Sequence, residues 1–91
     1  DGYSPAKGYN GLALCDIAEG NYDSALTNIS SGITVSDTDD LQSLLFNEVI
    51  AYEKKLDFAS ALEKAQTYVG MYPDDADGQK EVAFLKTRTG A

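Results

Sequence analysis

The sequence predicts an all-α domain of about five antiparallel helices arranged as helix-turn-helix repeats. Apolar residues recur at helical spacing along most of the chain, and only two prolines occur in 91 residues. No stretch alternates apolar and polar residues in the manner of a half-buried strand. Short polar segments separate the periodic stretches, which predicts short connections between antiparallel neighbours.

The first helix is expected from Tyr9 to Ala18, after a lead-in at residues 1–8 that is rich in turn formers. Apolar residues occur on most sides of this segment, which favours a helix buried between neighbours. Gly20 is expected to end the helix, because glycine is common just after a helix C-terminus.

The second helix follows a cap at Asn21 and carries its apolar residues on one face. These residues are Tyr22, Ala25, Leu26, Ile29 and Ile33. Gly32 lies inside the helix, where glycine costs about 1 kcal/mol relative to alanine. Its presence there predicts a close approach of two backbones.

The third helix is expected after the polar segment 36–40, and the fourth after a cap at Asp57. The apolar stripe of the third helix consists of Leu41, Leu45, Val49, Tyr52 and Leu56, with Phe46 and Ile50 on another face. The stripe of the fourth consists of Phe58, Ala61, Leu62, Ala65, Tyr68, Val69 and Tyr72. Pro73 ends it. A last helix is expected to run to about Thr87, with Lys86 and Arg88 complementing its negative end.

The charge of the chain restricts its partners. The net charge is −8, and no Lys or Arg occurs between Lys7 and Lys54. Half of the chain therefore has no cation to neutralise phosphates, so neither nucleic acid nor an anionic membrane surface is expected as a partner. A basic peptide or protein stays open as a partner, beside the simpler interpretation that acidity keeps the domain soluble. No run of about 18 apolar residues occurs, so no direct membrane insertion is expected.

Catalytic chemistry is not expected. Cys15 is the only cysteine, which excludes an intrachain disulfide, and its apolar neighbours predict a small core residue. The chain has no histidine to activate a serine or cysteine nucleophile. No pair of carboxylates stands out for acid–base work. We therefore expect no enzyme and no cofactor.

One segment of the chain occurs twice, 36 positions apart. Residues 20–26 match residues 56–62, and each copy contains a cap, an aromatic residue, two spacers, alanine and leucine. The small alanine lets the second helix of a pair approach the first, and the aromatic residue fills the gap at the turn. The spacing lies within the range of helical repeats.

These residues resemble the tetratricopeptide-repeat (TPR) family, whose helix pairs stack into an α-α superhelix. In repeat one (residues 9–37) the matching positions are Tyr9, Leu12, Ala13, Gly20, Tyr22 and Ala25. In repeat two (residues 39–73) they are Leu45, Val49, Tyr52, Phe58, Ala61 and Pro73. The resemblance covers residues 8–88 and implies one domain at residues 9–89, in which residues 75–88 form a capping helix.

Three positions depart from the family pattern. Asp16 stands where the family often has Tyr, Asp37 stands at the late proline position, and Leu56 stands where the turn glycine is expected. Other stretches, at residues 47–57, 72–75 and 84–88, resemble repeat proteins of Gram-positive bacteria, several of which are surface lipoproteins. That resemblance implies a bacterial setting and leaves the compartment open between cell surface and cytoplasm.

The family resemblance also implies a binding surface. In TPR proteins the first helix of each pair lines the concave surface. Carrying those positions over gives Asn10, Leu14, Phe46, Asn47, Ile50, Lys80 and Phe84. They imply an apolar strip flanked by asparagines that can hydrogen-bond a peptide backbone. The alternative is that these side chains pack against one another or against further chain. The lysine–arginine clamp of some family members is not expected, because the first helix has no cation.

Two acidic clusters, Asp37-Asp39-Asp40 and Asp74-Asp75-Asp77, are expected to cap helices. The second cluster partly matches a calcium loop, but that loop needs acidic residues at the positions of Pro73 and Phe84, so no metal site is expected.

Two functions from different classes follow from the sequence. The first is a non-enzymatic scaffold module that binds a protein or peptide through its concave face. The second is a structural block of a longer solenoid or of an oligomer, with no ligand of its own. The second alternative arises because about three repeats are usually needed for stability.

Overall fold

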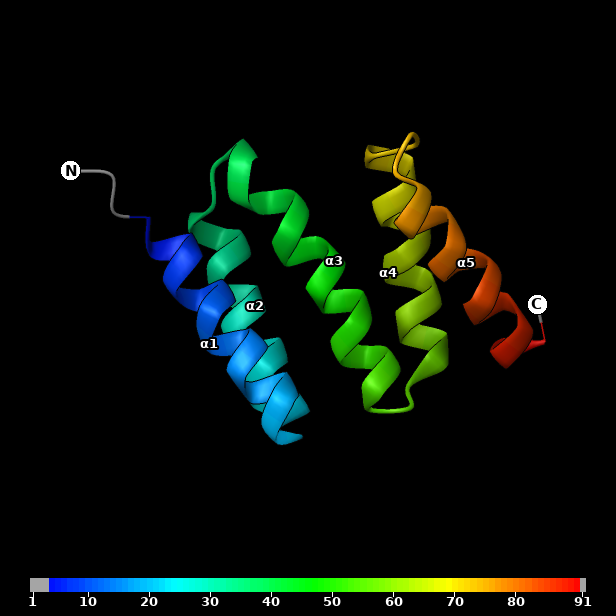
Figure 1. The fold of residues 1–91 in the computed structure, drawn as a ribbon, viewed down its shortest axis with the longest axis horizontal. Helices are drawn as coiled ribbons and strands as arrows, with labels where there is room; N and C mark the ends of the chain where they lie inside the picture. Colours follow the sequence, from blue (N-terminus) through cyan, green and yellow to red (C-terminus); the bar gives the residue numbers. More distant parts are fainter. Residues whose placement is uncertain (1–3, 91) are drawn as a thin grey trace.

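Five α-helices follow one another along the chain, each roughly antiparallel to the next (Figure 1). The computed structural model describes residues 4–90, and of Thr38 and Asp39 it describes the backbone alone. The helices are α1 (Pro5–Glu19), α2 (Tyr22–Val35), α3 (Thr38–Lys54), α4 (Phe58–Met71) and α5 (Ala76–Thr89). Residues 4–90 contain no strand. The predicted all-α class of helix-turn-helix repeats is confirmed.

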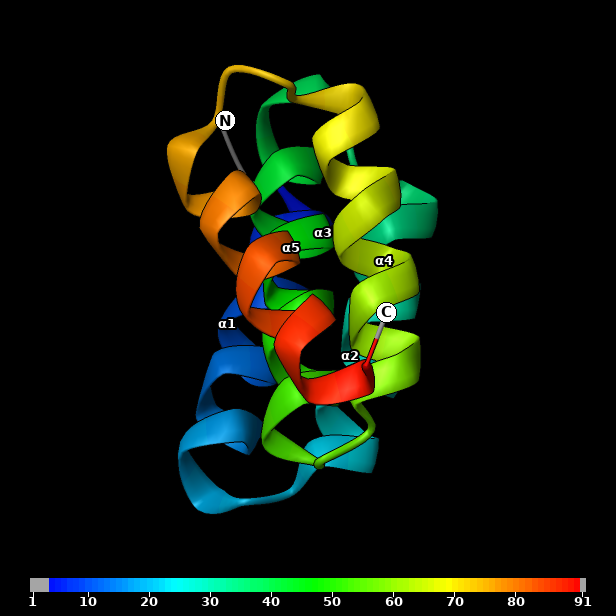
Figure 2. The same cartoon turned by 90° about the vertical axis from the view of Figure 1, so that its right-hand side faces the viewer.

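The helices form two layers, which Figure 2 shows from the side. One layer consists of α1, α3 and α5, and the other of α2 and α4. Each helix packs on its neighbours in sequence, and α1 also packs on α3. The domain measures 46 × 29 × 17 Å, with α1 and α5 toward opposite ends of its longest axis. We call the outer surface of the first layer the α1–α3–α5 face.

The corner between α1 and α2 recurs, with the same backbone geometry, between α3 and α4. Gly20 and Leu56 both adopt the left-handed conformation, with φ of 82° and 69°. The residue after each of them donates its backbone N–H to a carbonyl five positions earlier, at 2.8 Å in the first corner and 2.9 Å in the second. Ala25 and Ala61, at the equivalent position of each following helix, are fully buried. The repeated sequence segment therefore forms one structural corner twice.

Leu56 is strained in this corner, and its replacement by glycine should stabilise the protein. A non-glycine residue in the left-handed region costs about 1–2 kcal/mol, and the Leu56 side chain is 72% exposed, so little packing is lost with it. Glycine adds entropy to the unfolded chain, which offsets part of this gain. We expect Leu56→Gly to raise the free energy of unfolding by about 0.5–1 kcal/mol in urea denaturation.

The equivalent corner supplies the matched control. Gly20 has φ of 82°, and a Cβ there would meet nothing within 4 Å, so Gly20→Ala tests backbone strain alone. It should lower the free energy of unfolding by about 1 kcal/mol. A loss of stability in Leu56→Gly would contradict the equivalence of the two corners.

α1 begins at Pro5, four residues earlier than the sequence predicted. Ser4 caps it by accepting the backbone N–H of Lys7 at 3.4 Å, and Pro5 occupies the first turn, where its missing N–H would have had no helical partner. The predicted lead-in is therefore wrong from residue 5 onward, and residues 1–3 lie outside the described part. Because α1 includes Lys7, the expectation of a first helix without a cation is also wrong.

Aspartate caps explain most of the remaining helix starts, as predicted. Asp37, Asp57 and Asp75 each accept a backbone N–H from the first turn that follows, at 3.2, 3.2 and 3.1 Å. Asn21 occupies the N-cap position of α2 but makes no side-chain capping bond. The predicted cap contribution of the Asp39 side chain lies outside what the structure describes.

The buried side chains form two clusters that share α3. The first, between α1, α2 and α3, contains Ala6, Ala13, Ala25, Ile29, Leu44 and Ala51. The second, between α3, α4 and α5, contains Val49, Ala61, Leu62, Ala65 and Leu85. A Cβ added at Gly32 would lie 2.8 Å from Cδ2 of Leu44, so close packing occurs at Gly32 as predicted, but a leucine side chain and not a second backbone makes the contact.

The outer side of α1 is more exposed than the sequence predicted. Leu12 and Leu14 are 56% and 49% exposed, and Cys15 is exposed. The expectation of a helix buried on most sides, with Cys15 in the core, is therefore wrong. The physical reason is position: α1 lies toward one end of the array and packs only on α2 and α3.

Candidate functional site

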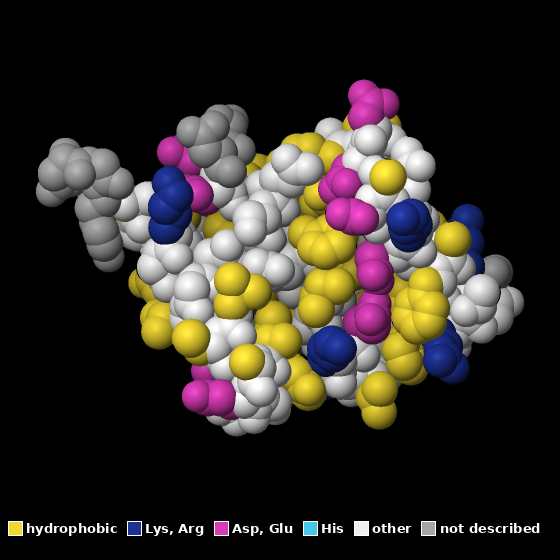
Figure 3. Space-filling view, in the orientation of Figure 1, with side chains coloured by type: hydrophobic (Ala, Val, Ile, Leu, Met, Phe, Trp, Pro, Cys, Tyr) yellow, Lys and Arg dark blue, Asp and Glu magenta, His cyan; other side chains and the backbone are white. Residues whose placement is uncertain are grey.

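All seven candidate residues from the sequence lie on α1, α3 or α5, the helices of one layer. Asn10 and Leu14 belong to α1, and Lys80 and Phe84 to α5; the three others, Phe46, Asn47 and Ile50, belong to α3. Leu14 and Phe84 are 49% and 39% exposed, while Phe46 and Ile50 are half-buried. Figure 3 shows hydrophobic side chains gathered in the middle of this face, with a column of acidic side chains beside them.

The structure brings some of these residues together and leaves others apart. Asn10 and Asn47 are in direct contact across α1 and α3: the Asn47 Nδ2 donates to the Asn10 Oδ1 at 2.7 Å. The Asn10 Nδ2 in turn donates to Ser43 Oγ at 3.0 Å. Phe84, in contrast, lies near the end of α5, under the Arg88 guanidinium at 5.3 Å from its ring. The amide groups expected to meet a peptide thus also tie α1 to α3.

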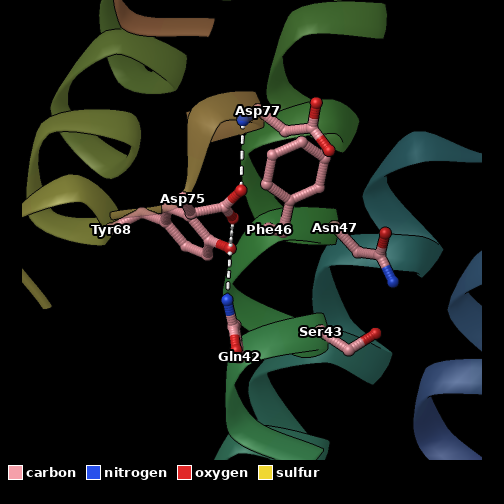
Figure 4. Close-up of a pocket in the computed structure, with 7 residues that line it drawn as sticks. All are labelled: Gln42, Ser43, Phe46, Asn47, Tyr68, Asp75 and Asp77. Atoms are coloured by element: carbon pink, nitrogen blue, oxygen red, sulfur yellow. Dashed lines mark hydrogen bonds between the residues drawn. The ribbon is translucent and has the colours of Figure 1, made fainter. Parts of the chain in front are cut away.

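A hollow of about 340 Å³ opens on the α1–α3–α5 face between α3 and the start of α5, and Tyr68 of α4 forms part of its wall (Figure 4). It is lined by Gln42, Ser43, Phe46, Asn47, Tyr68, Asp75 and Asp77. Of these residues, only Phe46 and Asn47 are among the binding-surface candidates from the sequence. Gln42 and Ser43 lie one turn before them on α3, so helical periodicity could have found these two. Tyr68, Asp75 and Asp77 come from other elements and could be found only from the fold.

Tyr68 is the fixed wall of the hollow. Its hydroxyl donates a hydrogen bond to the Asp75 carboxylate and accepts one from Gln42 Nε2 at 3.0 Å. The Phe46 ring meets the Tyr68 ring edge-on, with 5.4 Å between the ring centroids. Burial and the bond to Asp75 raise the pKa of the Tyr68 hydroxyl, and the same bond lowers the pKa of Asp75. Three helices therefore hold this wall in one arrangement before any ligand arrives.

Gly78 explains how α5 comes so close to Tyr68. It is buried, and a Cβ at this position would lie 2.7 Å from Cε1 of the Tyr68 ring. The absence of a side chain therefore lets the first turn of α5 pack directly on the aromatic ring. This contact places Asp75 and Asp77 at the rim of the hollow.

A pair of carboxyl groups links α3 and α5 further along the same face. Glu81 of α5 lies beside Glu53 of α3, and the pKa of the Glu81 carboxyl is raised to about 7. The largest cause is burial, followed by the bond to Glu53 and the charges of Glu53 and Asp77, while Lys54 acts in the opposite direction. One oxygen of each, Glu53 Oε1 and Glu81 Oε2, is buried and has no hydrogen-bond partner within residues 4–90. Near neutral pH the Glu81 carboxyl is therefore about half protonated.

The chemistry of the site suits recognition of apolar and cationic groups. Aromatic rings, amides and carboxylates meet in an open hollow with a preformed wall. In the described part of the chain, no three potential ligands are close enough together to hold a metal ion. None of the described helices has the length and apolar character needed to cross a bilayer.

The functional proposal for this domain rests on the geometry of the site. No protein-family model matches this chain, and no curated protein matches it.

Proposed function

We propose that this domain is a non-enzymatic scaffold module of the tetratricopeptide-repeat type, which binds a peptide or protein segment on its α1–α3–α5 face. The observation that carries the proposal is the hollow beside Phe46 and Asn47, with Ile50 one turn further along α3. Its polar and aromatic groups are held in place by bonds from three helices, so little ordering is needed on binding. The duplicated corner supports the repeat assignment.

Selection from a displayed library of random peptides tests this proposal. Peptides that bind the immobilised domain should lose at least tenfold in affinity when Phe46→Ala and Ile50→Ala are combined, because two apolar contact surfaces are removed. Fluorescence anisotropy of labelled peptides measures the affinity. Circular dichroism checks that helicity is unchanged.

A matched variant controls for the loss of exposed apolar area. Val35 and Met71 are 49% and 48% exposed and lie on α2 and α4, in the other layer. Val35→Ala combined with Met71→Ala should change affinity less than twofold. Peptides whose affinity is insensitive to Phe46→Ala and Ile50→Ala would refute binding at this face.

The exposed side of α1 favours a second candidate function, that of a block in a larger assembly. A second hollow is lined by Pro5, Gly8, Tyr9 and Leu12 of α1. In the 36-residue repeat, Gly8 corresponds to Leu44 of α3, which is completely buried between α1, α2 and α3. Sedimentation velocity over a range of concentrations distinguishes the candidates: a monomer at all concentrations would argue against self-association.

A further inference from the structure

The two sides of the channel between α3 and α5 differ in chemistry. Phe46, Ile50 and Glu53 follow one another at i, i+4 and i+7 and therefore lie along one side of α3. On α5 the same spacing is occupied by Asp77, Glu81 and Phe84, and the two helices run in the same direction (Figure 1). Phe46 and Asp77 share the hollow, and Glu53 and Glu81 lie beside each other one to two turns further along. The α3 side is mainly apolar and the α5 side mainly acidic.

Within residues 4–90 no cation forms an ion pair with Asp77 or Glu81, although Lys80 lies between them on α5. Lys54 is the one cation that acts appreciably on Glu81, and the other charges that act on it belong to Glu53 and Asp77. Lys7 and Lys55 are paired elsewhere, with Asp40 and Asp23. The acidic column in Figure 3 borders the central hydrophobic patch directly. A partner that brings a positive charge to this column would meet uncompensated carboxylates next to an apolar wall.

We infer that the segment bound by this face carries a lysine or arginine next to an apolar residue. The cation lies along Asp77 and Glu81, and the apolar side chain packs on Phe46 and Ile50. This inference rests on the proposed function and names the chemistry of its partner. Asp77 and Glu81 are four residues apart on α5, which separates them by about 6 Å along the helix axis. That distance matches two positions of an extended peptide, so a second cation two residues away would meet the second carboxylate.

The carboxyl pair gives this mode of binding a measurable signature. With a pKa of about 7, Glu81 is partly protonated at neutral pH, and an incoming cation favours its ionised form. Binding of a basic peptide should therefore release protons. Calorimetry in two buffers of different ionisation enthalpy, near pH 7, measures that release.

The peptides selected from the random library provide the test. Those whose binding depends on Phe46 and Ile50 should be enriched in lysine or arginine beside an apolar residue. Asp77→Asn combined with Glu81→Gln should then weaken their binding about tenfold, and so should a change of the peptide cations to glutamine. The matched control, Glu19→Gln with Glu63→Gln, removes two exposed carboxylates elsewhere and should weaken binding less than twofold.

Other results would overturn this inference, or the proposed function together with it. If the selected peptides depend on Phe46 and Ile50 but are neutral or acidic, the inference is overturned and the proposed function stands. Equal weakening by the two charge variants would also overturn it, because attraction would then reflect the net charge alone. If no selected peptide depends on Phe46 and Ile50, both proposals fail.

Discussion

Replacement of Leu44 by alanine should lower the free energy of unfolding by about 3–5 kcal/mol. Leu44 is completely buried in the cluster between α1, α2 and α3, and its Cδ2 lies against the backbone of α2 at Gly32. Removal of its isopropyl group leaves a cavity that the neighbouring helices cannot fill, because alanines and Ile29 surround it. Native domains have a total free energy of unfolding of about 5–15 kcal/mol, so this change would remove a large part of the stability. Urea denaturation followed by circular dichroism measures the change.

The contact between Leu44 and Gly32 allows a sharper version of this test. Gly32→Ala alone adds a methyl group 2.8 Å from Leu44 Cδ2 and 3.1 Å from the Cβ of Tyr9, so we expect it to destabilise the protein. In the Leu44→Ala background the same methyl group fills part of the cavity, and Gly32→Ala should then stabilise. If Gly32→Ala changes the free energy of unfolding in the same direction in both backgrounds, Gly32 does not pack against Leu44. Leu45→Ala, at the half-buried next position of α3, serves as the control and should cost less.

The second large effect concerns pH. The stability of the domain should fall as pH rises from about 4.5 to about 7, because burial and Glu53 raise the pKa of Glu81 from 4.5 to about 7 in the folded state. A carboxyl group with a raised pKa binds its proton more tightly when folded, so its stabilising contribution is complete below pH 4.5 and is lost through pH 7. Solvent screening reduces the energy expected from this shift to about 1–2 kcal/mol.

Glu81→Gln should remove most of this pH dependence. Glutamine cannot ionise, so the variant should be about 1 kcal/mol more stable than the natural sequence at pH 8 and similar to it at pH 4.5. Glu63→Gln removes the same charge from an exposed position on α4 and should leave the slope between pH 5 and 8 unchanged. Urea denaturation at a series of pH values measures both. An unchanged slope in Glu81→Gln would show that another group titrates in this range.

The candidate site was only partly predictable from the sequence. Phe46, Asn47 and Ile50 could be placed on one side of a helix because helical periodicity is local. The bond between Asn10 and Asn47 joins residues 37 positions apart, and Glu53 and Glu81 come together from different helices. Such contacts depend on the separation and rotation of packed helices, which no local pattern encodes.

The exposure of α1 illustrates the same limit. Its composition predicted burial on most sides, yet Leu12, Leu14 and Cys15 are exposed. Composition describes what a helix is able to bury, whereas its neighbours decide what is buried. The predicted lead-in at residues 1–8 was wrong from residue 5 onward for a local reason. Ser4 and Pro5 are turn formers, but they also suit a helix cap and the first turn of a helix.

The sequence by itself determined the helices, their order and the corner that occurs twice, because caps, helical period and backbone preference act over a few residues. It also determined the place of the close approach, since Gly32 has no side chain to keep α3 away from α2. Only the tertiary structure decided that Tyr68, Asp75 and Gln42 form one wall and that Glu81 is partly buried beside Glu53. These groups meet because α4 positions α3 and α5 in one layer, and the shift in the pKa of Glu81 follows from the burial and charge that this packing creates.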